Sequence, residues 1–155
     1  MRDKNKILLI YFLTASGIIA WLYMIFLAPY LRSRSSGLNT FIYALFSPFC
    51  HQISSRSFSI FHHPLAVCAR CLGIYFGFLG GIVLYPFVRG FSDISIPKVK
   101  TLIFLSVPIV IDTMGNYFLW MSPSWLRFLL GVIWGLILPF YFIAGIADYF
   151  INIKK

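Results

Sequence analysis

Every cysteine of this chain lies in one of two short stretches, residues 50–52 (Cys-His-Gln) and residues 68–71 (Cys-Ala-Arg-Cys). A C-x-x-C pair at the start of a helix can place two sulfurs on one side of a single ion, about 2.3 Å from it if the ion is zinc. A cysteine and a histidine from the preceding segment can supply the remaining ligands. The predicted metal ligands are therefore Cys50, His51, Cys68 and Cys71, a Cys₃His set that suits zinc, with iron as the alternative.

Other interpretations of these cysteines stay open. Cys68 and Cys71 could instead be the redox pair of a membrane thiol-disulfide oxidoreductase, because Arg70 between them would favour a neighbouring thiolate. Buried cysteines also pack as small hydrophobic side chains without any chemistry. The odd number of cysteines would leave one thiol over in a purely disulfide framework. His62 and His63 are reserve metal ligands, because they come close before Cys68 in the chain.

A second group of polar residues lies inside apolar stretches. Asp112 and Asn116 are one helical turn apart, and an ionised aspartate in a membrane requires a partner. Arg70 and Arg127 are the candidate partners, and two arginines for one aspartate leave a positive charge over. The group is either a structural ion pair or a polar pocket beside the cysteines. Such a pocket could bind an anionic small ligand, and could serve a small carrier or scaffold protein.

The rest of the chain must position these residues in a membrane. It has 155 residues, of which 60% are hydrophobic and 11% charged, and its mean hydropathy is +0.87. A soluble domain of this size could not bury so much apolar surface. The net charge of +9 comes from basic residues that flank apolar runs, so the expected partners are membrane lipids and not nucleic acid. No Ser-His-Asp set, phosphate loop or paired carboxylates suggest a hydrolase or a kinase.

Four apolar stretches reach the length of about 20 residues that a bilayer-spanning helix needs. They cover about residues 7–29, 65–88, 101–120 and 125–151. Residues 39–49 are too few to span and predict an interfacial or re-entrant helix, capped by Asn39 or Thr40, that delivers Cys50 and His51 to the membrane surface. The predicted fold is all-α: residues 1–155 form a single domain, a multi-pass bundle of four transmembrane helices. The sequence leaves the oligomeric state open.

Glycine spacing predicts which spans pack together. The second span carries Gly73, Gly77 and Gly81 on one face, and the fourth carries Gly131 and Gly135. Glycines four residues apart let two helix backbones approach closely in a membrane. Spans two and four are therefore expected to be neighbours, with Cys68 and Cys71 on the opposite face of span two.

Loop charge predicts the orientation. Lysine and arginine are in excess at both termini and in the loop between spans two and three: Arg2, Lys4, Lys6, Arg89, Lys98, Lys100, Lys154 and Lys155. Cytoplasmic loops carry such an excess. Both termini are therefore expected in the cytoplasm, with the cysteines at the outer face of the cell membrane.

The motifs resemble those of an uncharacterised family of small prokaryotic integral membrane proteins, a domain of unknown function. The resemblance rests on residues 50–52 (CHQ), 56–58 (RSF), 63–64 (HP) and 67–77 (VCARCLGIYFG), and on Pro108, Asp112, Arg127, Gly131 and Gly135. It covers roughly residues 50–135. It implies the architecture and the site residues, and no reaction.

Overall fold

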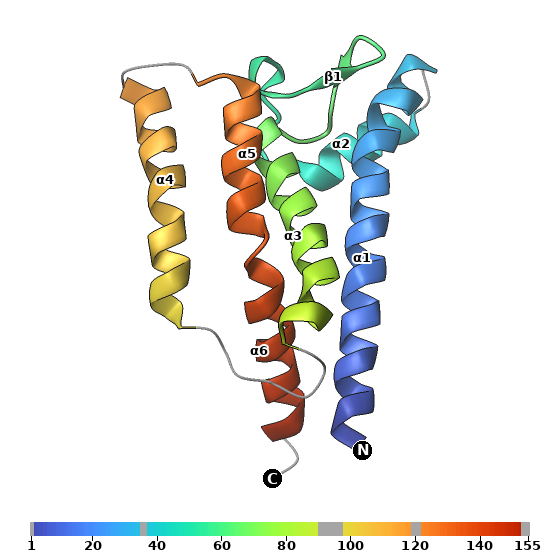
Figure 1. Ribbon diagram of the computed structural model, residues 1–155. Coiled ribbons are helices and arrows are strands. Elements are labelled where there is room, and N and C mark those ends of the chain that lie inside the picture. The colour runs from blue at the N-terminus through green and yellow to red at the C-terminus, as the bar shows by residue number, and fades with distance from the viewer. Residues whose placement is uncertain (1, 35–36, 90–97, 119–121, 153–155) are drawn as a thin grey trace.

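The computed structural model describes residues 2–34, 37–89, 98–118 and 122–152 (Figure 1). Its elements are α1 (Arg2–Ser33), α2 (Leu38–Phe46), the 3-10 turn η1 (Ser54–Arg56), β1 (Ser59–Ile60), β2 (His63–Pro64), α3 (Ala69–Val88), α4 (Val99–Phe118), α5 (Ser124–Gly135) and α6 (Leu138–Asn152). The predicted end of the third span at Trp120 and the basic residues Lys154 and Lys155 lie outside the described residues.

Four segments are long and apolar enough to cross a membrane. They are Asn5–Ser33 in α1, Ala69–Val88 in α3, Val99–Asn116 in α4, and Ser124–Tyr149, which combines α5 and α6. The prediction of an all-α, multi-pass bundle of four spans is thereby confirmed. A two-residue β1–β2 pairing is the sheet that the described part of the chain contains.

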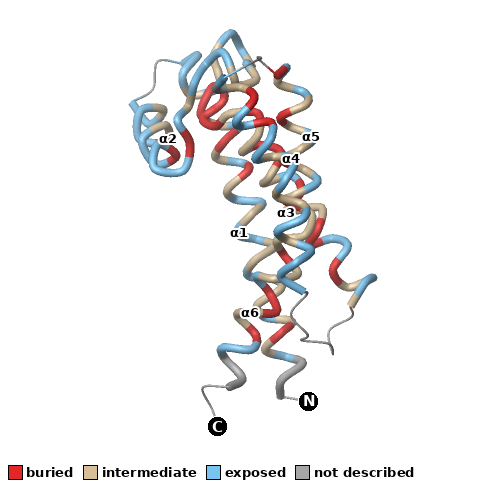
Figure 2. Tube along the Cα trace, turned by 90° about the vertical axis from the view of Figure 1, so that its left-hand side faces the viewer, coloured by how far each residue is buried: buried red, intermediate tan, exposed pale blue. Residues whose placement is uncertain are grey.

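The spans lie in the order α4, α5, α3, α1 across the bundle (Figure 1). α3 packs most extensively on α5, α4 packs on α5, and α1 packs on α2, α3 and α6. Buried residues are sparse in the first half of α1, whose described side chains are mostly intermediate or exposed, and they gather where the loop segments meet the helices (Figure 2). Much of the apolar surface is therefore left to face lipid, as a membrane bundle requires.

The glycines bring α3 and α5 into backbone contact. A Cβ built on Gly77 would lie 2.3 Å from the carbonyl oxygen of Val132, and one on Gly135 would lie 2.3 Å from that of Ile74. Gly73 and Gly131 are equally confined by the opposite backbone. The predicted packing of spans two and four is confirmed, and it leaves no room for any side chain between the helices.

The fourth span is interrupted at Leu136 and Ile137, although the sequence predicted one continuous stretch. Pro139 has no N–H to donate to the carbonyl of Gly135, four residues earlier. α5 ends at that glycine, and a tighter bond from Ile137 N–H to the carbonyl of Trp134 (3.3 Å) closes the turn. The second half of the span continues as α6.

α2 is the short helix expected between the first two spans, and it lies across the bundle axis (Figure 1). Its buried residues Ile42 and Phe46 face the core, and Phe46 stacks edge-on against Trp21 of α1 with ring centroids 4.7 Å apart. The predicted cap is wrong, because the helix begins at Leu38 after Gly37. Asn39 and Thr40 bond to each other in the first turn (2.9 Å) and cap no backbone N–H.

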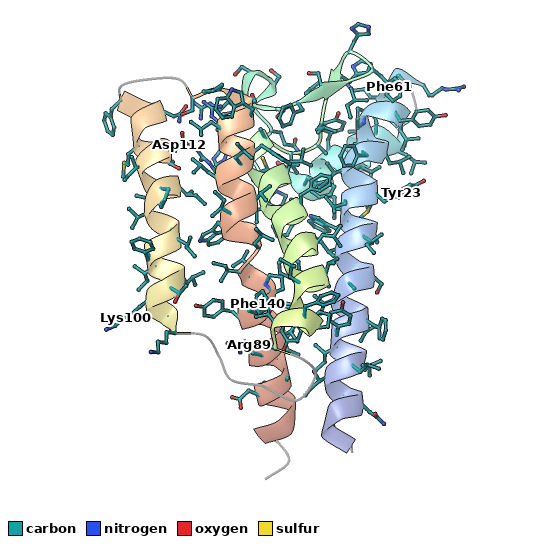
Figure 3. All side chains as sticks on the ribbon, in the orientation of Figure 1. Tyr23, Phe61, Arg89, Lys100, Asp112 and Phe140 are labelled. Atoms are coloured by element: carbon teal, nitrogen blue, oxygen red, sulfur yellow. The ribbon has the colours of Figure 1, made fainter. Side chains whose placement is uncertain are left out.

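The start of α1 and the end of α6 lie at one end of the bundle (Figure 1). Arg89 and Lys100 lie at that end as well, whereas Phe61, in the β1–β2 turn, lies at the other (Figure 3). Both termini lie at the same end because a chain that crosses the bundle an even number of times returns to the end where it began. That the end with the termini faces the cytoplasm stays a prediction from loop charge.

Candidate functional site

The three cysteines come together where α3 begins. The Sγ atoms of Cys50, Cys68 and Cys71 all lie within 4.8 Å of one another, and all three thiols are free. Cys50 is buried, and the other two are half-buried. The cluster lies at the end of the bundle opposite the termini, just before the membrane span Ala69–Val88.

Local structure explains how a loop cysteine reaches the helix. After α2 the backbone N–H of Cys50 donates to the carbonyl of Phe46 (3.0 Å), so the chain turns back at once. The backbone N–H of Cys68 then donates to the sulfur of Cys50 (3.1 Å). Cys68 is the N-cap of α3 and Cys71 lies in its first turn, so the positive end of the helix dipole faces the sulfurs.

A hairpin closes the loop between Cys50 and Cys68. Strands β1 and β2 pair antiparallel, and Phe61 and His62 between them both have positive φ angles, 53° and 62°. Such a turn usually contains Asn or Gly, so the sequence did not reveal it. The N–H of Leu65 donates to the carbonyl of Phe58 (2.8 Å) and the hydroxyl of Tyr43 donates to the carbonyl of Pro64, which ties the hairpin base to α2.

The sulfurs share charge unequally. Hydrogen bonds from the thiols of Cys68 and Cys71 lower the pKa of Cys50 well below its usual range. The bond to Cys50 raises the pKa of Cys68 in turn. The neighbouring thiols therefore favour a thiolate within the cluster, and a bound cation would favour ionisation of further thiols.

A buried polar network lies beside the cysteines, between α3, α4 and α5. Arg70 forms an ion pair with Asp112, whose side chain is 6% exposed (Figure 3 shows Asp112 on α4). Asn116 Nδ2 donates to Asp112 Oδ1 (3.0 Å) and to Ser122 Oγ (2.7 Å). The hydroxyl of Ser122 also donates to the Asp112 carboxylate. Asp112 is thus satisfied by one charge and two neutral donors.

Arg127 joins this network through an amide and not through the carboxylate. Its Nη2 donates to Asn116 Oδ1, which also accepts the backbone N–H of Ser122 (2.9 Å). The residue is only 5% exposed. Within the described part of the chain, its Nε and that of Arg70 are buried without a hydrogen-bond partner.

The cysteines and the arginines face one cavity of about 340 Å³. Its lining includes all three cysteines, the three arginines Arg56, Arg70 and Arg127, and the polar residues His51, Gln52, Thr113 and Asn116. Asp112 is buried behind the cavity lining and does not contribute to it. The volume lies within the range of small-molecule sites.

The residues of this cavity fall within a known family. The family model of predicted membrane proteins called DUF2085 matches residues 50–141, from Cys50 to beyond the end of α5. The chain belongs to the DUF2085 family. The uncharacterised protein MJ1492 of Methanocaldococcus jannaschii is 44% identical over 124 residues, which is 76% of this chain and 80% of that protein. No solved structure matches the chain.

The family match thus spans the cluster, the network and α3 to α5, and begins after α1 and α2. The structure brings Cys50, Cys68 and Cys71 together, as well as Arg70, Asp112, Asn116 and Arg127. His51 is exposed and lines the cavity, but its nitrogens are not part of the close sulfur group. His62 lies exposed in the hairpin turn and His63 lies half-buried in β2, and neither belongs to the group.

The sequence analysis did not assign several residues of the site, among them Ser122 and Arg56. Ser122 had no signal of its own, because it lies in a connection between helices and bonds to residues ten and six positions away. Arg56 belongs to the loop and reaches the cavity only through the fold of residues 50–68. Its place within the RSF motif was the available hint.

Proposed function

We propose that this DUF2085 protein binds one metal ion, zinc or iron, through the thiolates of Cys50, Cys68 and Cys71 at the membrane interface. The observation that carries this proposal is the mutual approach of the three sulfurs within 4.8 Å. Sulfurs held at about 2.3 Å around a tetrahedral ion lie about 3.8 Å apart, so a small contraction would seat the ion. Thiolate sulfurs are ligands that zinc and iron commonly take in proteins.

The surroundings favour a thiolate site. The N–H of Cys68 already bonds to the sulfur of Cys50, and the first turn of α3 presents its dipole to the other two sulfurs. The nearby guanidinium groups offset the net negative charge of an ion bound by three thiolates. Three protein ligands would leave a fourth position for water, substrate or a further side chain, and all three cysteines line the cavity.

The metal proposal is tested by elemental analysis of the purified full-length protein. We expect about one zinc or iron per chain, and Cys71→Ser is expected to lower that content at least about ten-fold, because two thiolates bind far more weakly than three. Ser57→Ala in the same loop is the matched control and should retain the metal. A wild-type chain that carries no stoichiometric metal, even after refilling with zinc or iron under reducing conditions, contradicts the proposal.

Substitution of His51 tests whether its imidazole is the fourth metal ligand, as the sequence predicts. His51 is exposed on the cavity, outside the close sulfur group, so His51→Ala is expected to retain at least about half of the metal. If His51→Ala loses as much metal as Cys71→Ser, the imidazole is a ligand in the bound state. The control is His62→Ala, which alters an exposed imidazole in the hairpin turn.

Thiol trapping separates the metal site from the alternative thiol-disulfide oxidoreductase. Arg70 pairs with Asp112 and not with the sulfurs, which removes the main support for an activated Cys68. We expect both cysteines to be alkylated in the metal-free protein across oxidising and reducing conditions. A Cys68–Cys71 disulfide that cycles with the redox buffer, in a chain without metal, would favour the oxidoreductase.

A further inference from the structure

Positive charge is in excess around the cavity. Three guanidinium groups line it, from Arg56, Arg70 and Arg127. Asp112 compensates one of them, through its ion pair with Arg70. An ion bound by three thiolates would supply at most one further net negative charge. At least one arginine is therefore left without a counter-charge in the described structure.

The lack of a counter-charge has the largest consequence for Arg127, because it is the most deeply buried of the three arginines. It is 5% exposed, and among the described residues its Nη2 donates to the neutral Asn116 amide while its buried Nε has no hydrogen-bond partner. A guanidinium is charged at every physiological pH and holds five donors in a planar fork that matches a carboxylate or phosphate. Burial of such a group costs free energy unless an anion pairs with it.

The depth of the cavity indicates where such an anion comes from. Cys68 immediately precedes the span Ala69–Val88, and Arg127 lies near the start of the span Ser124–Tyr149. The cavity is therefore at the level where lipid headgroups lie. α2 lies across the bundle next to the loop that carries Cys50 (Figure 1).

An apolar groove begins where the cavity ends. It has a volume of about 880 Å³ and lies between α1, α3 and α6, with Gly17, Trp21, Tyr75 and Phe142 among its lining residues. Phe49 lines both the groove and the charged cavity. The groove follows the hydrocarbon part of the spans, so an amphiphile whose polar group occupies the cavity could lay its chain there.

We propose that the cavity binds the phosphate of an anionic membrane lipid, whose acyl chain lies in the groove beyond Phe49. Arg127 and Arg56 bind the phosphate oxygens, and Arg70 contributes charge while it stays paired with Asp112. This inference goes beyond the metal-binding proposal and does not require it, because the arginines and not the sulfurs carry it.

The headgroup half is tested with the purified full chain in detergent, by native mass spectrometry with two lipids of identical chains. We expect dioleoyl phosphatidylglycerol to bind at least about ten-fold more tightly than dioleoyl phosphatidylcholine, because only the former carries net charge. Arg127→Gln should abolish most of this preference. Arg56 lies in the loop, outside the buried network. Arg56→Gln should therefore lower the affinity for phosphatidylglycerol at least about five-fold without a folding defect.

Arg34→Gln is the matched control, since Arg34 is exposed at the same end of the bundle but does not line the cavity. It should change the affinity less than about two-fold. Equal binding of the two lipids, or equal effects of Arg34→Gln and Arg56→Gln, would overturn the proposal in favour of non-specific attraction to a basic surface.

The chain half is tested by filling the groove. A Cβ on Gly17 meets nothing within 4 Å, so Gly17→Leu occupies groove space without a clash. We expect it to weaken phosphatidylglycerol at least about five-fold, whereas Gly145→Leu, equally open but outside the groove, should not. If Gly17→Leu has no effect and inorganic phosphate binds as tightly as the lipid, the ligand is a free oxyanion and the lipid assignment is wrong. Metal content and lipid preference are measured independently, so the two proposals fail separately.

Discussion

Gly77→Ala is expected to lower the free energy of unfolding by about 2 kcal/mol or more, although it adds a single methyl group. The new Cβ would lie 2.3 Å from the carbonyl oxygen of Val132 and 2.9 Å from the backbone of Gly135 and Leu136. These are backbone atoms of the facing helix, so no side-chain rotation can relieve the overlap and α3 must move away from α5. Unfolding of the purified protein in detergent, followed by circular dichroism, measures the loss.

Gly145→Ala is the control for this prediction, since a Cβ at Gly145 meets nothing within 4 Å. It should leave stability unchanged or raise it by up to about 1 kcal/mol, because alanine is the better helix former. Equal effects of the two substitutions would mean that the α3–α5 contact does not support the fold. Because Cys68, Arg70 and Cys71 lie at the start of the helix that carries Gly77, Gly77→Ala should also lower the metal content of the purified chain.

Asp112→Ala is expected to destabilise the protein by about 3–5 kcal/mol, the cost of removing one partner of a buried ion pair. Asp112 is 6% exposed and pairs with Arg70, and it also accepts hydrogen bonds from Asn116 and Ser122. Its loss leaves the half-buried Arg70 guanidinium without its counter-charge and the Asn116 and Ser122 donors without their acceptor. Thermal unfolding in detergent measures the effect.

A double variant shows whether the charge itself is the cause. Arg70→Met with Asp112→Leu removes both charges, and buried pairs replaced in this way lose little stability. We expect the double variant to be more stable than Asp112→Ala alone. Asp148→Ala, at an exposed aspartate of α6, is the control and should cost less than about 1 kcal/mol. A double variant as unstable as Asp112→Ala would show that side-chain packing, and not charge, dominates.

The helices were predictable because lipid imposes a simple rule on sequence. A span needs about 20 apolar residues, and small residues four apart mark a close helix contact. Both rules act within one segment, so they identified four spans and the packing of Gly77 and Gly135 without any knowledge of the tertiary structure. The interruption at Leu136 was missed, because Pro139 changes the backbone without changing the hydropathy of the stretch.

The candidate site was only partly predictable, because its members come from separate segments. Cys68 and Cys71 follow from helical spacing, but the approach of Cys50 depends on the turn after α2 and on a hairpin built from Phe61 and His62 at positive φ. Asp112 required a basic partner, and the choice of Arg70 over Arg127 depended on how α4 and α5 are placed. Ser122 and Arg56 entered the site only through that placement.

The sequence alone therefore determined that the chain is a four-span membrane protein with a cysteine cluster at a helix start and a charged group in the membrane. These properties depend on composition and short-range periodicity, and both can be recognised without knowledge of the fold. Only the tertiary structure decided that three sulfurs, and not His51, form the close group, and that Arg127 bonds to Asn116 and faces a cavity. Such contacts join residues distant in the chain, so their geometry is set by the packing of the whole bundle.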